Sequence, residues 1–223
     1  MKIAVIGTGK TGAEVAKLLE EEQIVGPFNS KNKPTVESLR KADAAIIFVP
    51  GTAVDDILEV VLESGIPSVW GSTGYEWPED LNERLKSGNA TWLRASNFSL
   101  GMNIVRQCIK IISKGSEILS NPVFHIHEVH HVHKKDAPSG TALSWKEWLD
   151  KQAEITSERK GDVKGVHELQ MKTSYESIQL RHEAHDRAVF AEGAIWAAEQ
   201  IVRKPIPPGL HDIETFFDQV IGL

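Results

Sequence analysis

The residues of this chain that are best suited to chemistry lie between Glu128 and Ala142, a stretch that reads EVHHVHKKDAPSGTA. His130, His131, His133 and Lys134 stand close together in it. An imidazole changes its charge near neutral pH and can donate a proton, whereas a lysine ammonium is a compact cation that attracts carboxylates. This short segment therefore combines proton donors with a fixed positive charge.

Small and hydroxyl-bearing residues follow this cluster and precede a run with helical spacing. Ser139, Gly140 and Thr141 come directly before Ala142, and apolar positions recur from there to Leu149. Ser or Thr before such a run is a signal for the start of a helix. The first N–H groups of a helix have no partner within it and attract anions. The segment thus predicts a site for a carboxylated substrate that must be protonated.

Two other interpretations of the histidines remain open at this point. They could lie at the solvated end of a strand, or they could bind a metal ion. Odd-numbered residues share one face of a strand, so His125, His127, His131 and His133 could converge on an ion. The lysine pair that follows would repel a cation, and no cysteine is close by. We therefore predict proton transfer, and no metal.

A glycine-rich loop near the start of the chain indicates a second site. Lys2–Ile6 is a short apolar run suited to a buried strand, and helical spacing resumes at Val15. Between them lie Gly7, Thr8, Gly9, Lys10, Thr11 and Gly12. In this GxGxxG spacing the first glycine allows a tight turn, the second lets a pyrophosphate approach, and the third lets helix and strand pack closely. We predict a dinucleotide site, with an ordinary glycine turn as the alternative.

The next predicted strand, Ile24–Phe28, bears on which dinucleotide is bound. NAD-selective folds commonly place an acidic residue after this strand, where it binds the ribose 2′-hydroxyl. The sequence here is Asn29–Lys33, which contains no acid. Ser30 and Lys31 could instead contact a 2′-phosphate, so we expect NADPH to be preferred over NADH.

The rest of the first hundred residues alternates strand and helix patterns, which favours a doubly wound parallel α/β sheet. Further strands are predicted at Ala44–Val49, Pro67–Trp70 and Thr91–Ala95. The second half has a different pattern, with a charged segment, Lys151–Gly165, that we expect to be a loop. Strands are predicted there at Pro122–His130, His167–Thr173 and Ser177–His182, and helices at Val189–Val202, with Asp186 as its cap, and at His211–Val220. This half is expected to be a smaller α+β domain whose open mixed sheet could assemble with other copies.

Composition excludes several classes of protein. The net charge is −6 over 223 residues and no basic block is present, which argues against a nucleic-acid binder. No stretch has the length of a membrane span, and the chain begins with a strand pattern rather than a signal peptide, so we expect a cytoplasmic protein. The single cysteine, Cys108, rules out an internal disulfide. We expect it in the core, on the helix face of Ile104, Ile111 and Ile112.

These segments together resemble the 4-hydroxy-tetrahydrodipicolinate reductase family, also called dihydrodipicolinate reductase. The family signature E-x-H-H-x-x-K-x-D-A-P-S-G-T-A is matched from Glu128 to Ala142. The family's GTTG loop is similar to Gly71–Gly74, and its ANFS segment is similar to Ser96–Gly101. A late H-x-A-x-x-R pattern begins at His182.

The resemblance implies an NAD(P)H-dependent reduction in lysine and diaminopimelate synthesis, by a cytoplasmic homotetramer. His130 would be the general acid and Lys134 the second catalytic residue. The substrate, a small dicarboxylate, would be bound by His131, Ser139, Gly140 and Thr141. Beyond the glycine loop, the cofactor would be lined by Gly71, Ser72, Thr73, Ala95, Ser96, Asn97 and Phe98.

The resemblance also divides the chain. Residues 1–98 would form the dinucleotide-binding domain, completed by residues 205–223, and residues 99–204 the substrate-binding and oligomerisation domain. Three alternative functions remain: a related reductase of another aspartate-derived imine or aldehyde, a non-catalytic dinucleotide-binding module, and a metal-dependent hydrolase.

Overall fold

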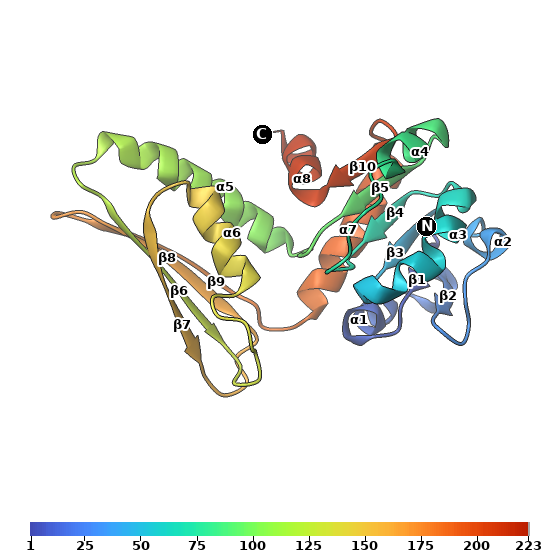
Figure 1. Ribbon diagram of the computed structural model, residues 1–223, viewed down its shortest axis with the longest axis horizontal. Coiled ribbons are helices and arrows are strands. Elements are labelled where there is room, and N and C mark those ends of the chain that lie inside the picture. Colours follow the sequence, from blue (N-terminus) through green and yellow to red (C-terminus); the bar gives the residue numbers. More distant parts are fainter. Residues whose placement is uncertain (223) are drawn as a thin grey trace. The chain divides into compact units, whose positions relative to one another are not determined.

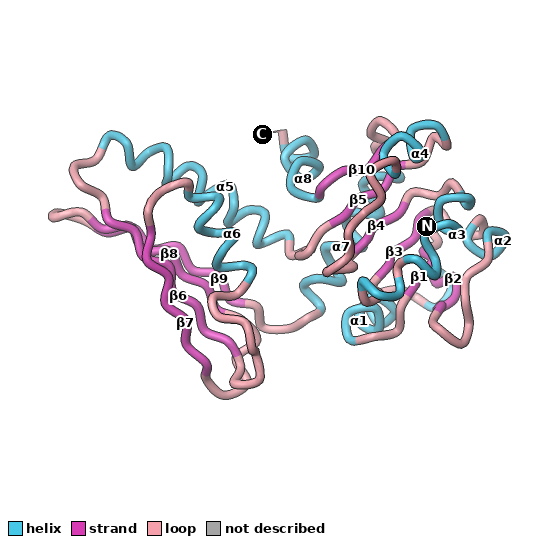
Figure 2. The backbone as a smooth tube through the Cα atoms, viewed as in Figure 1, coloured by secondary structure: helices cyan, strands magenta, loops and turns pink. Residues whose placement is uncertain are grey.

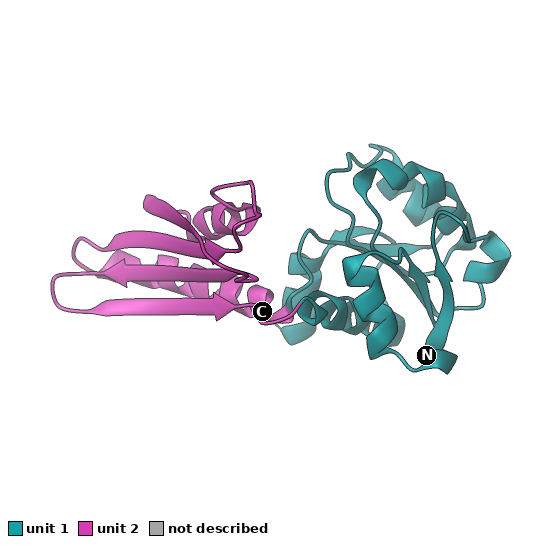
Figure 3. Cartoon of the chain, turned by 90° about the horizontal axis from the view of Figure 1, so that it is seen from below, with its two compact units in different colours: residues 1–99, 187–223 teal, residues 100–186 magenta. Residues whose placement is uncertain are grey.

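The computed structural model describes residues 1–222 and separates into two compact units (Figure 3). Unit 1 consists of Met1–Ser99 together with the chain from Arg187 onward. Unit 2 is the intervening segment, Leu100–Asp186. Within the described residues, none of the helices is both long and apolar enough to cross a membrane.

Unit 1 is built on a six-stranded sheet in which every pairing is parallel, in the order β10-β5-β4-β3-β1-β2 (Figure 1). Its strands are β1 (Ile3–Ile6), β2 (Ile24–Phe28), β3 (Ala44–Ile47), β4 (Ser68–Trp70), β5 (Thr91–Arg94) and β10 (Gly209–Asp212). Its helices are α1 (Lys10–Leu18), α2 (Val36–Leu39), α3 (Asp55–Ser64), α4 (Leu81–Ser87), α7 (Ala188–Arg203) and α8 (Ile213–Ile221), with short 3-10 turns at Glu21–Gln23 and Gly51–Ala53.

Successive side chains of these strands pack alternately into two separate hydrophobic cores, one on each face of the sheet. Ala4 and Ile6 of β1 pack with α2, α3 and α4 on one face of the sheet. Ile3 and Val5 pack with α1, α7 and α8 on the other face. Strands buried on both faces read as continuous apolar runs, which is why β1 was recognisable from sequence. The predicted doubly wound parallel fold of this half is confirmed.

Helix α7 belongs to unit 1, whereas the sequence-based division placed it with residues 99–204. Its inner face consists of small residues, among them Ala191, Ala194 and Ala198, all fully buried in the core. Gly193 lies so near the chain after β5 that an added Cβ would stand 1.7 Å from the Phe98 carbonyl oxygen. These small side chains let α7 lie directly against the parallel sheet.

Unit 2 is a four-stranded mixed sheet in the order β7-β6-β8-β9, with two helices packed on one face (Figure 2). Its strands are β6 (Val123–His130), β7 (Ala153–Arg159), β8 (Val166–Lys172) and β9 (Ser177–Glu183), and its helices are α5 (Leu100–Gly115) and α6 (Gly140–Leu149), with a 3-10 turn at Ser116–Ile118. Strand β7 runs parallel to β6, and β8 runs antiparallel to it. The predicted open mixed sheet is confirmed.

Several sequence-based expectations about elements are wrong. The charged segment Lys151–Gly165 contains β7 rather than only a loop, and β10 precedes the last helix, which begins at Ile213 rather than His211. The N-cap position of α7 is Arg187, one residue after the predicted Asp186. Helices α2 and α4 were not anticipated.

The expected core position of Cys108 is also wrong. Cys108 is only partly buried, and Ile104 and Ile111 are 56% and 70% exposed. Helix α5 instead turns Met102, Val105 and Ile109 toward the sheet. Two apolar stripes lie side by side on this helix, and periodicity alone could not show which one is buried.

Candidate functional site

The glycine loop lies at the carboxyl end of β1, where the strand order of the sheet reverses. Ligands of open α/β sheets bind at such a point. Gly7 has a φ of +99°, and a Cβ there would stand 2.2 Å from the Phe48 carbonyl oxygen. A Cβ on Gly12 would stand 1.9 Å from the Gly7 carbonyl oxygen. A Cβ on Gly9 would have no atom within 4 Å, so the middle glycine faces open space in front of α1.

This arrangement fits a dinucleotide pyrophosphate. Helix α1 starts at Lys10 with Gly9 as its N-cap, so the amides of Lys10 and Thr11 lie in its first turn. Such amides point outward along the helix axis and favour an anion. Gly7 and Gly12 are closely packed and Gly9 is open, so binding of the cofactor by this loop stays a prediction that the geometry permits.

A cavity of about 290 Å³ in unit 1 contains the next group of predicted cofactor residues. It opens at the carboxyl ends of β4 and β5 and is lined in part by Ser72, Thr73, Ala95 and Ser96. Four of the seven cofactor residues predicted in the loops after β4 and β5 therefore line the same cavity.

The other three residues of these loops have structural contacts. The Asn97 side chain accepts a hydrogen bond of 2.9 Å from the Ser99 backbone N–H. Phe98 is buried against Phe48, with ring centroids 6.0 Å apart. A Cβ on Gly71 would stand 2.1 Å from the Phe48 ring. These three hold the loops in place.

The loop after β2 presents Ser30 and Lys31, both exposed. Its shape is fixed by Asn29, whose side-chain oxygen accepts from the backbone N–H groups of Lys31 and Asn32 at 2.9 and 3.1 Å. Lys33 forms an ion pair of 3.3 Å with Asp56. Both lysines of this loop are thus exposed, and Lys33 is the one that is engaged in an ion pair.

In unit 2, strand β6 places Glu128 and His130 on its helix-covered face. Phe124 and Ile126, on the same face, belong to the apolar core under α5 and α6. Because side chains alternate along a strand, the next two even positions continue that face. Glu128 is fully buried and His130 is 7% exposed. A carboxylate in such a place needs partners, because a charge buried without them is strongly destabilising.

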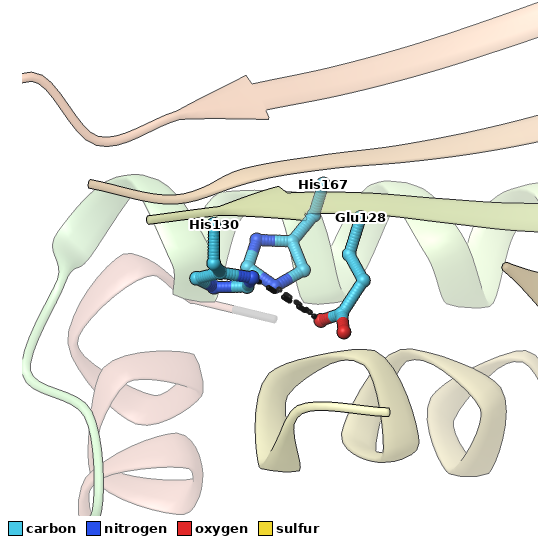
Figure 4. A group of neighbouring side chains, drawn as sticks. All are labelled: Glu128, His130 and His167. Carbon is cyan, nitrogen blue, oxygen red and sulfur yellow. Dashed lines mark ion pairs between the residues drawn. The ribbon is translucent and has the colours of Figure 1, made fainter. Parts of the chain in front are cut away.

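Glu128 has partners from three segments of unit 2. The backbone N–H of Ser139 donates to Oε1 at 3.0 Å, and the Arg159 guanidinium reaches the same oxygen at 3.3 Å. The other oxygen, Oε2, lies 3.5 Å from His130 Nδ1 and 3.7 Å from His167 Nε2 (Figure 4). His167 is brought there by the sheet register, which pairs it with Glu128 across β6 and β8.

Arg159 connects this cluster to the loop that carries Lys134. It lies opposite His130 across β6 and β7. Besides Glu128, its guanidinium donates to the backbone oxygens of Lys134 and Asp136. One cation therefore balances the buried carboxylate and fixes the path of the loop after β6.

The loop between β6 and α6 contains the remaining predicted substrate residues. The Lys134 ammonium pairs with Asp136 at 2.9 Å, which lowers the pKa of that carboxyl. His131 lies just past the end of β6. Gly140 and Thr141 open α6, where their amides lack partners within the helix.

Ser139 was predicted to bind substrate, but its side chain is buried within unit 2. It is 2% exposed, caps α6 by accepting from the Ala142 N–H at 3.2 Å, and lies 3.2 Å from His167 Nε2. Its backbone N–H donates to Glu128 Oε1. The contacts of Ser139 are thus within the protein, and it joins the start of α6 to the buried carboxylate.

The buried cluster shifts the acid–base properties of its members. Burial would raise the pKa of Glu128, but hydrogen bonds from Ser139 and Ser157 outweigh it and lower that pKa. Burial lowers the pKa of His130, against the opposing effect of Glu128. Burial, together with His130, lowers the pKa of His167 to about 3. Glu128 is therefore anionic and His167 neutral at neutral pH.

The depressed pKa of His167 predicts a pH-dependent stability. An unfolded chain protonates this imidazole below about pH 6.5, whereas the folded protein does so only near pH 3. Stability should therefore fall as pH decreases through this window, by up to about 1.4 kcal/mol per pH unit for one proton. His167→Gln has no imidazole at this position, so its stability should not fall for this reason. The difference in unfolding free energy between wild type and His167→Gln should therefore become smaller by about 1–2 kcal/mol between pH 7 and pH 5. Urea unfolding at both pH values measures it; His133→Gln, in the exposed loop, is the control, and an unchanged deficit would contradict the assignment.

Glu128, His130 and His167 also offer three atoms within 4.8 Å of one another, a spacing that could accommodate a metal ion. The Arg159 guanidinium already balances the charge of Glu128, and Lys134 adds positive charge nearby. The four histidines considered for a metal from sequence are arranged differently. His125 and His127 stack on the other face of β6 and share the Thr156 hydroxyl, whereas His131 and His133 follow the strand. Proton transfer by His130 therefore stays a prediction.

Sequence reasoning missed His167 and Arg159. His167 was assigned only to a strand, and Arg159 to a loop. A signal for this cluster was present, since Phe124 and Ile126 mark the buried face of β6 and place Glu128 on it. A buried acid on an apolar face implies cationic or hydrogen-bonding partners from the adjacent strands.

Comparisons with known proteins show which family this chain is similar to. Residues 101–217 match the family model described as dihydrodipicolinate reductase, C-terminus, and residues 1–114 match the model described as CoA binding domain. A 4-hydroxy-tetrahydrodipicolinate reductase of Bdellovibrio bacteriovorus is 33% identical over 223 residues, covering 96% of this chain and 94% of the relative. One from Pelagibacter ubique is 33% identical over 205 residues, covering 80% and 77%. The solved structure titled dipicolinate-bound dihydrodipicolinate reductase, from a Paenisporosarcina species, shares the fold with a TM-score of 0.74 at 18% identity, covering 96% and 98%.

Proposed function

The chain belongs to the 4-hydroxy-tetrahydrodipicolinate reductase family, and we propose that it reduces 4-hydroxy-tetrahydrodipicolinate to tetrahydrodipicolinate with NAD(P)H, in lysine and diaminopimelate synthesis. The observation that carries this function is the cluster at the end of β6, where His130 adjoins a buried, paired carboxylate and a loop with Lys134 follows. The glycine loop of unit 1 fits the pyrophosphate of the cofactor. A bound nicotinamide would supply the hydride.

The roles of the protein's own residues follow from their chemistry. His130 donates a proton to the substrate carbon next to the one that receives hydride, because that carbon gains electron density. Lys134 leaves Asp136 and pairs with a substrate carboxylate or with the developing negative charge. The first amides of α6, from Gly140 and Thr141, bind the second carboxylate, as helix N-termini do. His131 contributes a further donor beside the strand end.

The low pKa of His130 in the free protein is compatible with this role. A general acid must carry its proton when the reaction occurs, and two substrate carboxylates beside it would raise its pKa by favouring the imidazolium. We therefore expect kcat/KM to fall with increasing pH through a lower pKa than kcat does, because kcat/KM reports the free enzyme. Rates measured from pH 5 to 9 test this order, and coincident midpoints would contradict it.

A substrate panel separates this function from its alternatives. Turnover of the cyclic imine dicarboxylate, but not of aspartate-derived aldehydes, supports the proposal, and the reverse result supports a related reductase. Binding of NADPH without turnover of any candidate would indicate a binding module. Activity that survives a chelator would exclude a metal-dependent hydrolase.

Lys31 is proposed to favour NADPH over NADH. Lys31→Ala should weaken NADPH binding by about tenfold, since a charge-assisted contact to the 2′-phosphate contributes about 1.5 kcal/mol, and should leave NADH binding nearly unchanged. Calorimetric titration with NADPH, NADH and coenzyme A measures the ranking, and the last ligand tests the match of residues 1–114 to a CoA binding domain. Lys33→Ala is the control, because Lys33 pairs with Asp56. Equal losses for NADH and NADPH would contradict the 2′-phosphate contact.

We also propose a homotetramer, assembled through the sheet of unit 2. Strands β7 and β9 are the two edges of this sheet, and the face opposite α5 and α6 includes Val123, which is 67% exposed. Edges and apolar faces of this kind are commonly covered by another copy. Light scattering on the purified protein tests the assembly.

A further inference from the structure

The two nitrogens of His130 have different surroundings. Nδ1 is buried and lies 3.5 Å from Glu128 Oε2, and neither atom has a hydrogen-bond partner closer by (Figure 4). A modest shift of the imidazole would make this a hydrogen bond, which ionised acceptors form at 2.7–2.9 Å. Glu128 is thus the acceptor available to one side of the ring.

Glu128 cannot turn away from the ring. It is fully buried, and its other oxygen is held by the Ser139 N–H at 3.0 Å and by Arg159 at 3.3 Å. These contacts aim Oε2 toward the two histidines. His167 competes for it at 3.7 Å, but its Nε2 also lies 3.2 Å from the Ser139 hydroxyl, which offers it another partner.

The opposite nitrogen, Nε2, faces a glycine. A Cβ on Gly165 would stand 3.2 Å from His130 Nε2 and 3.5 Å from its Cδ2. Gly165 is buried just before β8, and its φ is outside the left-handed region. Backbone conformation therefore does not require glycine here. A larger residue at position 165 would instead fill the space beside His130 Nε2.

From these contacts we infer that Glu128 is a positioning residue that accepts a hydrogen bond from His130 Nδ1–H. The nitrogen that donates the proton to the substrate is then Nε2. Gly165 leaves space for the substrate beside this nitrogen. The inference rests on the proposed function and names the donor atom within it. In the step, the Nε2–H bond breaks, the proton goes to the substrate carbon, and its bonding pair stays on the ring. The imidazole becomes neutral with its proton on Nδ1, facing Glu128, and water restores the Nε2 proton afterwards.

Nitrogen NMR of the wild-type protein tests this directly and needs no turnover. Above the pKa of His130, its neutral ring should carry the proton on Nδ1, with the signal assigned by its loss in His130→Asn. A ring protonated on Nε2 instead would overturn the inference, even if the enzyme is an active reductase. Absence of reductase activity in wild type would overturn the proposed function and leave this readout intact.

Variants give the kinetic counterpart. Glu128→Gln keeps the shape but removes the charge, and should lower kcat by at least about tenfold, with less effect on KM, since it weakens proton donation rather than substrate binding. Glu128→Gln should also lower the pH at which kcat/KM falls to half its maximum. The charged and titratable groups facing His130 are Glu128, His167, Arg159, Lys134 and Asp136, of which this variant changes one.

Two further variants distinguish positioning from folding. Glu158→Gln, an exposed acid on the neighbouring strand, is the matched control and should retain wild-type kcat and midpoint. Gly165→Ala should lower kcat without changing the Nδ1–H tautomer, because the methyl group contacts only the donating side. The inference would be contradicted if the pH midpoints of kcat/KM were equal in wild type and Glu128→Gln. Full activity in Gly165→Ala would also contradict it.

Discussion

Replacing His130 with asparagine is expected to lower kcat by on the order of 10²- to 10⁴-fold, the usual contribution of a positioned general acid. Asparagine keeps a polar side chain in a site that is 7% exposed, but it cannot donate a proton at this pH. Binding of NADPH should remain nearly unchanged, since the glycine loop that we assign to it belongs to unit 1. Single-turnover rates and a fluorescence titration of NADPH separate the two effects.

His133→Asn is the matched control for this experiment, because His133 lies in the same segment but is exposed in the loop after β6. It should retain wild-type kcat. A His130→Asn protein that turns over at the wild-type rate would refute the assignment of the acid, whereas loss of NADPH binding would point to a folding defect.

Replacing Lys134 with methionine should lower kcat/KM by on the order of 10²-fold. A hydrogen bond to a charged group contributes about 1.5–3 kcal/mol, and the upper value corresponds to roughly 150-fold. Methionine preserves the length of the side chain while removing its charge. The backbone oxygen of residue 134 would still accept from Arg159, so the loop should keep its path. Initial rates over a range of substrate concentrations measure the loss.

Asp136→Asn provides the opposite test at the same place. Asp136 pairs with Lys134 at 2.9 Å, and this pair must open when a substrate carboxylate binds. Removing the carboxylate charge should therefore lower KM slightly, or leave it unchanged, rather than raise it. A large rise in KM in Asp136→Asn together with little loss in Lys134→Met would show that the acid, not the ammonium, contacts the substrate.

The first strand and glycine loop could be predicted from sequence because their chemistry is local. Strand β1 is buried on both faces and reads as one apolar run, and Gly7 and Gly12 stand where the backbone permits only glycine. The alternation of strands and helices then fixed the parallel architecture. Strand β10 escaped prediction because it is short and follows a proline-rich turn.

The helix α5 and strand β7 show where pattern reasoning is insufficient. Helix α5 carries Ile104 and Ile111 on one stripe and Val105 and Ile109 on another, and only packing decides which is buried. Strand β7 is an edge strand with several charged residues, so it lacks the alternation that marks a half-buried strand.

The candidate site could be predicted only in part for a related reason. His130 and Lys134 lie in one continuous signature, but His167 and Arg159 reach Glu128 through strand register, which brings distant residues opposite one another. Register follows from the pairing of β6 with β7 and β8, and one of those strands was not recognised. The second histidine and the balancing guanidinium therefore became visible only in the fold.

The loss of NADPH absorbance, when purified protein is added to 4-hydroxy-tetrahydrodipicolinate generated in situ, tests the central claim most directly. We expect rapid oxidation that depends on substrate, is faster with NADPH than with NADH, and is abolished in His130→Asn. Absence of oxidation with either cofactor, in a protein that still binds both, would contradict the claim that this chain is a reductase of that substrate.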